Sequence, residues 1–349
     1  QALKETLVIR DEQVRGSSQS VGLKPKQEES IDSVLDHTGS FTIAALPTGF
    51  GKTRIAQAAT WCLRRRGKGP TLMISPLISL MDDQRAQFKE FSEDIETNDN
   101  LAIGTSPGLS SAFLTVAEDR SKLELMDKAR KDDLDLLCCS PETLMSWSAG
   151  QMWIDMLTRS GNPPSLLVID EAHVIGDWGA SIRPEFQLLS WIKQRLLLAN
   201  PELRILLMSA TISGDEEKEL KKLFTTGFTK INKTVRATKT REDLYFHIER
   251  YDKDDPNAFD PIIEKIHHAW STVPPRWNSQ MAPARYAPPT IIYTPYKKIA
   301  EGEVKNKAKE HFASVQTYTG STSPVRRETI RDQFVKNEFD CLVATSAFG

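Results

Sequence analysis

The feature that most constrains the fold of this chain is a glycine-containing loop between an apolar run and a helix-forming run. The loop reads Pro47-Thr48-Gly49-Phe50-Gly51-Lys52-Thr53. It follows the apolar residues 41–46, and this order of strand, loop and helix is what a phosphate-binding loop requires. Gly49 and Gly51 allow backbone N–H groups to approach phosphate oxygens. Lys52 can place its ammonium against the β- and γ-phosphates, and Thr53 can offer its hydroxyl to Mg²⁺.

The loop departs from the general pattern at one position, because Leu46 stands where a glycine is usual. A chance glycine turn before a surface helix therefore stays open as an alternative when this motif is taken alone. The helix that begins near Lys52 would point the positive end of its dipole at the phosphates. The motif thus predicts a nucleotide-binding site.

A second motif, Asp170-Glu171-Ala172-His173, directly follows the apolar run 166–169. The run is typical of a buried strand, so the acids lie at its carboxyl end, where an open α/β sheet binds ligands. We expect Asp170 to hold Mg²⁺, partly through water, and Glu171 to orient and deprotonate the water that attacks the γ-phosphate. Either acid alone is more typical of a solvated strand end. The two motifs in this order predict nucleoside triphosphate hydrolysis.

From about residue 23 to residue 349 the chain resembles the superfamily 2 helicases, and among them the RecQ-like DNA helicases with a DEAH-type acidic motif. The resemblance implies ATP and Mg²⁺ as cofactors, with Thr53 and Asp170 holding the metal. It implies that Gln27 hydrogen-bonds the adenine edge, and Lys24 stands where an arginine is usual. The catalytic set implied is Lys52, Asp170, Glu171 and His173. The ATP-binding positions implied are Lys24, Gln27, Pro47, Thr48, Gly49, Phe50, Gly51, Lys52, Thr53 and Arg54.

Two further segments of the first half match helicase motifs that contact nucleic acid. Residues 74–84 and 140–144 are similar to strand-end motifs that give backbone and hydroxyl contacts to the phosphates of one strand. The positions implied are Ser75, Pro76, Leu77 and Ser140. Each segment alone is also consistent with a strand followed by a proline-containing turn. Ser209-Ala210-Thr211, after an apolar strand, resembles the motif that couples hydrolysis to strand movement.

The segment 175–186 supports the narrower RecQ-like resemblance, in which an aromatic-rich loop senses single-stranded DNA. Trp178 can stack on a base and Arg183 can clamp a phosphate. The segment departs from the family at residues 180–182, where Ala, Ser and Ile replace a His, an acid and an aromatic residue. The alternative, in which Trp178 packs into the core, stays open.

The second half shows apolar strand patterns at 244–248, 290–293, 315–318 and 341–345, which alternate with helical segments. This alternation predicts a parallel sheet. By resemblance, Thr294, Thr319 and Thr345 contact the backbone of the tracking strand. Taken singly, each is an ordinary strand-end hydroxyl.

The predicted fold class is α/β, with two tandem RecA-like P-loop NTPase domains on parallel sheets, the second truncated at its C-terminal end. We expect a polar lead-in at 1–20, the ATP-binding domain at 21–239 and the helicase C-terminal domain at 240–349. A proline-rich insert at about 269–289 cannot be helix or central strand. ATP with Mg²⁺ is expected in the cleft between the domains.

Composition is consistent with these motifs. The chain has 349 residues, a length that leads us to expect about two domains. Its hydrophobic residues, 39% of the total, are enough to form sizeable cores. A net charge of −2 argues against broad attraction to DNA but allows a local basic groove. We expect no zinc site, because Cys62, Cys138, Cys139 and Cys341 lack paired ligand spacing. With neither a membrane-length apolar run nor a signal-like start, we expect no membrane association and a cytoplasmic location, by the nucleoid in a bacterium or nuclear in a eukaryote.

The sequence therefore predicts an ATP-dependent DNA helicase or translocase that moves on single-stranded or tailed duplex DNA, with 3′ to 5′ direction by resemblance. Two alternatives stay open: an RNA helicase of the same superfamily, and a non-unwinding ATP- and DNA-binding subunit of a repair or defence complex with other proteins. The family's arginine-finger segment has no match in the sequence. We therefore expect these residues to belong to a longer protein, and the chain alone to bind ATP better than it hydrolyses it.

Overall fold

The computed structural model consists of two compact units of the chain, Gln1–Leu244 and Tyr245–Gly349. The described residues are 23–36, 38–76, 81, 84–89, 91, 109–114, 128, 133–145, 150–159, 161–177, 189–225, 232–237 and 290–345. The predicted lead-in, the strand at 244–248 and the proline-rich insert at 269–289 lie outside them.

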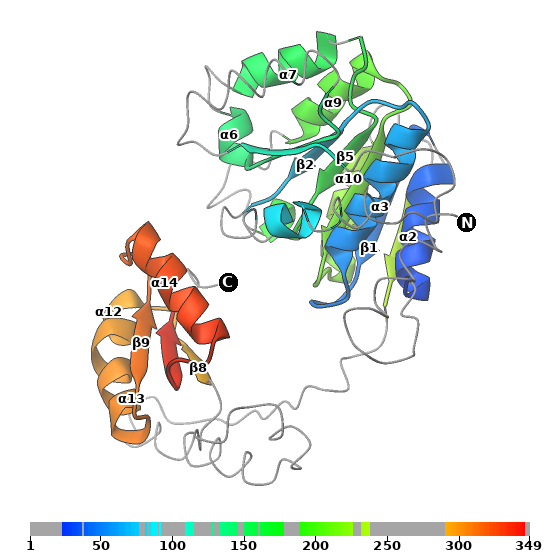
Figure 1. Cartoon of the computed structure of the whole chain (residues 1–349). Helices are drawn as coiled ribbons and strands as arrows, with labels where there is room; N and C mark the ends of the chain where they lie inside the picture. Colours follow the sequence, from blue (N-terminus) through cyan, green and yellow to red (C-terminus); the bar gives the residue numbers. More distant parts are fainter. Residues whose placement is uncertain are drawn as a thin grey trace, which may run out of the picture. The chain divides into compact units, whose positions relative to one another are not determined.

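The first unit is built on a seven-stranded sheet in the order β3-β4-β2-β5-β6-β1-β7. Figure 1 shows its strands β1, β2 and β5 between the helices of this unit. The strands are β1 (Phe41–Ala45), β2 (Thr71–Ile74), β3 (Ser111–Leu114), β4 (Leu136–Cys139), β5 (Leu166–Ile169), β6 (Arg204–Ser209) and β7 (Asn232–Arg236). Every pairing in this sheet is parallel. Every residue of β1, β2, β4, β5 and β6 is buried, which is why these segments are near-continuous apolar runs without alternation.

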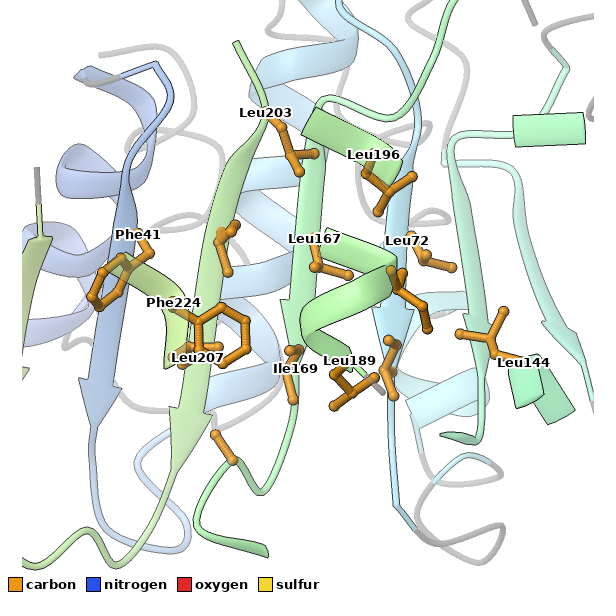
Figure 2. Packing of buried hydrophobic residues seen from close by; sticks show 14 of the residues in the cluster. Phe41, Leu72, Leu144, Leu167, Ile169, Leu189, Leu196, Leu203, Leu207 and Phe224 are labelled. Carbon is orange, nitrogen blue, oxygen red and sulfur yellow. The ribbon is translucent and has the colours of Figure 1, made fainter. Parts of the chain in front are cut away.

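Helices cover both faces of this sheet. They are α2 (Pro25–Asp36), α3 (Lys52–Arg65), α6 (Pro141–Met145), α7 (Gly150–Arg159), α8 (Val174–Asp177), α9 (Leu189–Ala199) and α10 (Gly214–Thr225). Alternate strand residues join opposite cores: Leu167 packs with α9 and α10, whereas Val168 packs with α2 and α3. Figure 2 shows the first core, in which Phe224 of α10 lies beside Phe41 of β1 with ring centroids 6.4 Å apart. Each buried side chain of this size stabilises the fold by about 1.5–3 kcal/mol.

The second unit has a three-stranded parallel sheet in the order β8-β10-β9. Its strands are β8 (Thr290–Tyr293), β9 (Val315–Tyr318) and β10 (Cys341–Ala344). Its helices are α12 (Lys297–Ile299), the π-helical segment Ala300–Val304, α13 (Lys305–His311) and α14 (Pro324–Val335). Central β10 is fully buried, with Val343 packed toward α13 and Leu342 toward α14. The α/β class with parallel sheets in both units is the predicted one.

Among the described residues, no helix combines the length and apolarity needed to span a bilayer.

Candidate active site

The predicted motifs of the first unit meet at one edge of its sheet. Ala45 of β1 pairs with Ser209 of β6, and Ile74 of β2 pairs with Ile169 of β5. Because β5 also pairs with β6, these four strands end side by side. The hydrogen bonding continues past the strand ends, since Leu46 N–H donates to the Ser209 carbonyl at 3.0 Å and Asp170 N–H donates to the Ile74 carbonyl at 2.9 Å. This is the carboxyl edge, where ligands bind in parallel sheets. The topology therefore brings the phosphate loop, the acidic motif and residues 209–211 together.

The phosphate loop takes its shape from two glycines in left-handed conformation, Gly49 with φ 75° and Gly51 with φ 86°. Side chains rarely adopt such angles. At Gly51 a Cβ atom would also lie 2.5 Å from Nε2 of Gln27, so a side chain there would have to displace the Gln27 amide. Helix α3 begins at the next residue, Lys52, which places its amino end at the loop. This is the arrangement that binds phosphate anions.

Lys52 folds back onto its own loop, where Nζ donates a hydrogen bond to the Leu46 carbonyl at 3.2 Å. Its charge also acts on the acidic motif, where it opposes the rise that burial causes in the pKa of Asp170 and adds to the hydrogen bond from His173 in lowering the pKa of Glu171. A cation within reach of both acids and of the loop is what binding a triphosphate with its metal requires.

Gln27 braces the phosphate loop, a contact that the sequence did not reveal. Its side chain is 6% exposed, and Nε2 donates to the carbonyls of Phe50 and Gly51, each at 3.0 Å. Its Oε1 accepts the Lys24 N–H at 2.8 Å. Both amide hydrogens thus serve the loop, so an adenine contact through Nε2 requires that it leave these carbonyls. The adenine role stays a prediction. Nearby, the Lys24 ammonium lies 4.6 Å from the centroid of the Phe50 ring.

Asp170 is a buried carboxyl group with an unusual pKa. Burial and then the charge of Glu171 raise its pKa to about 6. Two donors oppose this: Gln84 Nε2 bonds to Oδ2 at 2.7 Å, and the Glu171 N–H bonds to Oδ1 at 3.0 Å. A buried carboxylate that repels a second one favours a bound cation.

Glu171 has a positive φ of 46°, which is strained for a residue other than glycine and is a feature of functional sites. Nδ1 of His173 lies 3.2 Å from its Oε2. Burial raises the pKa of Glu171, but the hydrogen bond from His173 and the charge of Lys52 outweigh burial, so the pKa lies below its ordinary value. The same bond raises the pKa of His173. Glu171 is therefore kept ionised, as a general base must be.

The acidic motif and residues 209–211 form one hydrogen-bonded network. The Ser209 hydroxyl donates to the Thr211 carbonyl at 2.9 Å, and its oxygen lies 2.8 Å from Nδ1 of His173. Because the hydroxyl hydrogen is used on Thr211, Nδ1 of His173 carries the proton and shares it between the Ser209 oxygen and Glu171 Oε2. After burial, His173 and Lys52, the backbone of Ala210 also contributes to the pKa of Glu171, which it lowers. The direct contact that a coupling role requires is thus present.

The hydroxyls predicted to contact nucleic acid point into the protein. Ser140 accepts the Thr143 N–H at 3.2 Å and caps α6. Thr319 donates to Glu301 Oε1 at 2.7 Å, and Ser75 is fully buried with no partner for its hydroxyl among the described residues. Contact with a strand at these positions therefore favours backbone groups, and remains a prediction. Pro76 is buried, while Leu77, Trp178 and Arg183 lie outside the described residues.

The three threonines of the second unit gather at one sheet edge. Tyr293, Ala344 and Tyr318 are in register across the sheet, and each immediately precedes one threonine. Thr294 N–H donates to the Ala344 carbonyl at 2.9 Å, and Thr345 N–H donates to the Tyr318 carbonyl at 3.1 Å. All three are buried. Their contact with the tracking strand stays a prediction.

Gln84 is the site residue to which the sequence assigned no role, although it lies in the segment 74–84. Its side chain is 4% exposed. The sequence held a signal that Gln84 is buried, because it shares the spacing of one helix face with Met81, Phe88 and Phe91. All of these residues are buried. A polar residue on an otherwise apolar helix face requires a buried partner, and here the partner is Asp170.

Comparison with known proteins places the chain among helicases. The family model described as DEAD/DEAH box helicase matches residues 24–220. Over 93% of its length the chain is 28% identical to the probable ATP-dependent DNA helicase RecS of Bacillus subtilis, of which it covers 55%. It is 27% identical to the ATP-dependent DNA helicase RecQ of Pasteurella multocida over 93% of its length, and covers 42% of that protein. The chain thus spans about half the length of these curated relatives.

Solved structures show the same fold. The helicase MrfA bound to DNA and AMPPNP matches 99% of this chain with a TM-score of 0.67 and 16% identity, over 43% of its own length. The helicase Lhr of Mycobacterium smegmatis bound to single-stranded DNA and AMP-PNP matches 93% of the chain with a TM-score of 0.64 and 18% identity, over 40% of its own length. Because the family model matches more than half of the residues, the chain belongs to the DEAD/DEAH box helicase family, and its relatives include RecQ-type DNA helicases.

Proposed function

We propose that this chain is the motor part of an ATP-dependent DNA helicase that couples ATP hydrolysis to movement on single-stranded DNA and to duplex unwinding. One observation carries the proposal: the phosphate loop, the acidic motif and residues 209–211 share one sheet edge, where His173 bonds to both Glu171 and Ser209. The names of the relatives, which include several ATP-dependent DNA helicases, support DNA as the partner.

The residues at this edge fit ATP with Mg²⁺. Asp170 is a buried carboxyl group whose pKa is raised by burial and by Glu171, and the Thr53 hydroxyl stands in the first turn of α3. Oxygen ligands of this kind are those that Mg²⁺ prefers, so Thr53 and Asp170 would hold it. When bound, the metal neutralises charge on the β- and γ-phosphates.

The chain's own residues then have distinct tasks. Lys52 exchanges its bond to the Leu46 carbonyl for one to a phosphate oxygen. Glu171, kept ionised by His173 and Lys52, accepts a proton from the attacking water. The bond between His173 and Ser209 transmits the change at the acids to residues 209–211. By resemblance to RecQ-type helicases, we propose 3′ to 5′ movement on single-stranded or tailed duplex DNA.

The test is steady-state ATP hydrolysis by the full-length protein, with and without single-stranded DNA or RNA, at one fixed salt concentration. Stimulation by DNA is expected, followed by unwinding of 3′-tailed duplexes. Stimulation by RNA alone would replace DNA with RNA as the track, an outcome suggested by the putative RNA helicase R290 of mimivirus, 25% identical to this chain. Lack of stimulation by either would overturn the motor assignment.

The Glu171→Gln variant tests the general base, because it keeps the shape of the side chain and removes its basicity. We expect a loss of at least about 100-fold in turnover, the range for general base catalysis. Binding of an ATP analogue should persist, since the phosphate loop is unchanged. A variant that hydrolyses ATP at the normal rate would show that Glu171 does not take the proton.

A further inference from the structure

We propose that Gln84 is the positioning residue for Asp170, whose carboxylate it holds in the orientation that a divalent metal requires. The inference rests on the ATPase function proposed above. It concerns a side chain that is buried beside the acidic motif and belongs to none of the groups assigned so far to nucleotide, metal or nucleic acid.

The first observation is the geometry at the carboxylate. Gln84 Nε2 donates to Asp170 Oδ2 at 2.7 Å, which is the short distance typical of a bond to a charged acceptor. The other oxygen, Oδ1, accepts the Glu171 N–H at 3.0 Å. The two donors come from different elements, the helical residues 84–89 and the turn after β5. Together they fix both the rotation and the tilt of the carboxylate plane.

The second observation fixes the orientation of the amide itself. Cys138 Sγ lies 3.7 Å from Gln84 Oε1, and both side chains are buried. Burial raises the pKa of the Cys138 thiol well above its ordinary value, so the thiol keeps its hydrogen and donates it. An ionised carboxylate can only accept. The amide therefore has one satisfactory orientation, with nitrogen toward Asp170 and oxygen toward Cys138.

The third observation is the place of Gln84 in the fold. Strand β2 lies between β4, which carries Cys138, and β5, which leads to Asp170. The Gln84 side chain bonds to Cys138 and to Asp170, and so joins the two strands that flank β2. It also follows Ser75 and Pro76 along the chain, in the connection predicted to contact the nucleic-acid strand.

A purely structural role for Gln84 can be tested with a matched control, because the chain has a second buried glutamine close by. Gln57 of α3 is 3% exposed, and its Nε2 donates to the Gln87 carbonyl at 2.9 Å. It packs against the same helical residues and its amide bonds to a backbone carbonyl instead of a carboxylate. Gln57→Met and Gln84→Met remove the same group from comparable burial.

The experiment uses the full-length protein and two readouts. The first is the ATPase rate as a function of Mg²⁺ concentration, with kcat and KM for ATP determined separately. The second is equilibrium binding of a fluorescent ATP analogue in EDTA and in Mg²⁺, which needs no turnover. For Gln84→Met we expect Mg²⁺ affinity or kcat to fall by about 10- to 100-fold. This is the usual loss when one hydrogen-bond partner of a metal ligand is removed. Analogue binding in EDTA should equal that of the wild type.

The comparison with Gln57→Met decides the result. If both variants respond to Mg²⁺ alike, Gln84 only packs and the inference is overturned. If the wild type binds the analogue with Mg²⁺ dependence but hydrolyses no ATP, the proposed function fails while the binding readout still tests Gln84. Thermal unfolding checks that each variant is folded. Should Gln84→Met not fold, Gln84→Asn keeps the amide, withdraws it by one methylene and is expected to show the same selective loss of the Mg²⁺ response.

Discussion

The phosphate loop and the acidic motif lie at the same sheet edge, yet they are held in different ways. The loop is shaped by backbone conformation at Gly49 and Gly51, and one buried amide braces it through backbone carbonyls. The acidic motif is shaped by side-chain bonds from Gln84, His173 and Ser209. Adding a side chain at either glycine should therefore damage the shape of the loop, whereas removing side-chain atoms should damage the shape of the acidic motif.

Lys52→Ala should have the largest effect, because Lys52 is the side chain whose charge acts on both regions. We expect ATP turnover to fall by a factor on the order of 1,000, the upper range for loss of one charge-stabilising donor. The measurement is steady-state ATP hydrolysis with DNA. Lys68→Ala is the matched control, since the Lys68 ammonium pairs on the surface with Glu202 at 2.9 Å, and it should keep wild-type turnover. Retained activity in Lys52→Ala would contradict the assigned phosphate contact.

Gly51→Ala tests the backbone-held region. The new Cβ combines a strained positive φ with a 2.5 Å approach to Gln27, so we expect about 1–3 kcal/mol of lost stability together with weaker ATP-analogue binding. Gly67→Ala is the control, because φ there is 67° and a Cβ meets no heavy atom within 4 Å in the described part of the chain. Urea unfolding measures the stability of both variants. Equal losses of stability in the two variants would mean that the strain at positive φ alone destabilises Gly51→Ala, and that the approach to Gln27 adds nothing.

The sequence predicted most of the site because its motifs are local. A strand followed by a glycine loop or by acids places those groups at a sheet edge, and the strands at 166–169, 290–293 and 315–318 have the predicted bounds. The braces were not predictable in this way. Gln27 and Gln84 reach partners 23 and 86 residues away along the chain, and local periodicity carries no information on such contacts.

The strand-end hydroxyls show a second limit of local patterns. A serine or threonine after a strand can contact a ligand, cap a helix or bond to a neighbouring acid, and all three choices have the same local sequence. Ser140 caps a helix and Thr319 bonds to Glu301, which only the three-dimensional arrangement shows. The roles of Trp178 and Arg183 stay predictions.

Ser209→Ala tests the side-chain-held region with a smaller change. It removes the bonds of the Ser209 hydroxyl to His173 and to Thr211 but leaves Glu171 bonded to His173, so we expect ATP turnover within about tenfold of wild type, as for loss of neutral hydrogen bonds. Unwinding should fall further, because the link from the acids to residues 209–211 is cut. Both are measured on one preparation. Ser213→Ala removes only an exposed capping hydroxyl at 3.2 Å from Glu216 N and should alter neither. Proportional losses in both activities would argue against a coupling role.

Glu217→Gln should have the smallest effect of these changes, and the effect is on stability. It extends the comparison from the acidic motif to side-chain bonds farther along the chain. Glu217 of α10 accepts hydrogen bonds from Thr234 at 2.7 Å and Arg236 at 2.8 Å, both on β7. Arg236 also donates to the Ile212 carbonyl at 2.7 Å, directly after the 209–211 motif. This cluster therefore ties β7 and α10 to the segment that follows the coupling residues.

The pH dependence of this effect follows from the pKa of Glu217, which the hydrogen bond from Lys221 lowers to about 2 with help from Thr234 and Arg236, against the opposing effect of burial. A lowered folded-state pKa stabilises the protein fully above the ordinary value of 4.5, and this contribution is lost as pH falls toward 2. Because the group is partly exposed, Glu217→Gln should cost on the order of 1 kcal/mol at pH 7. Urea unfolding at pH 7 and near pH 2.5 should show the gap between variant and wild type closing. A gap that is unchanged by acid would mean that shape and hydrogen bonding at Glu217, and not its charge, hold β7 in place.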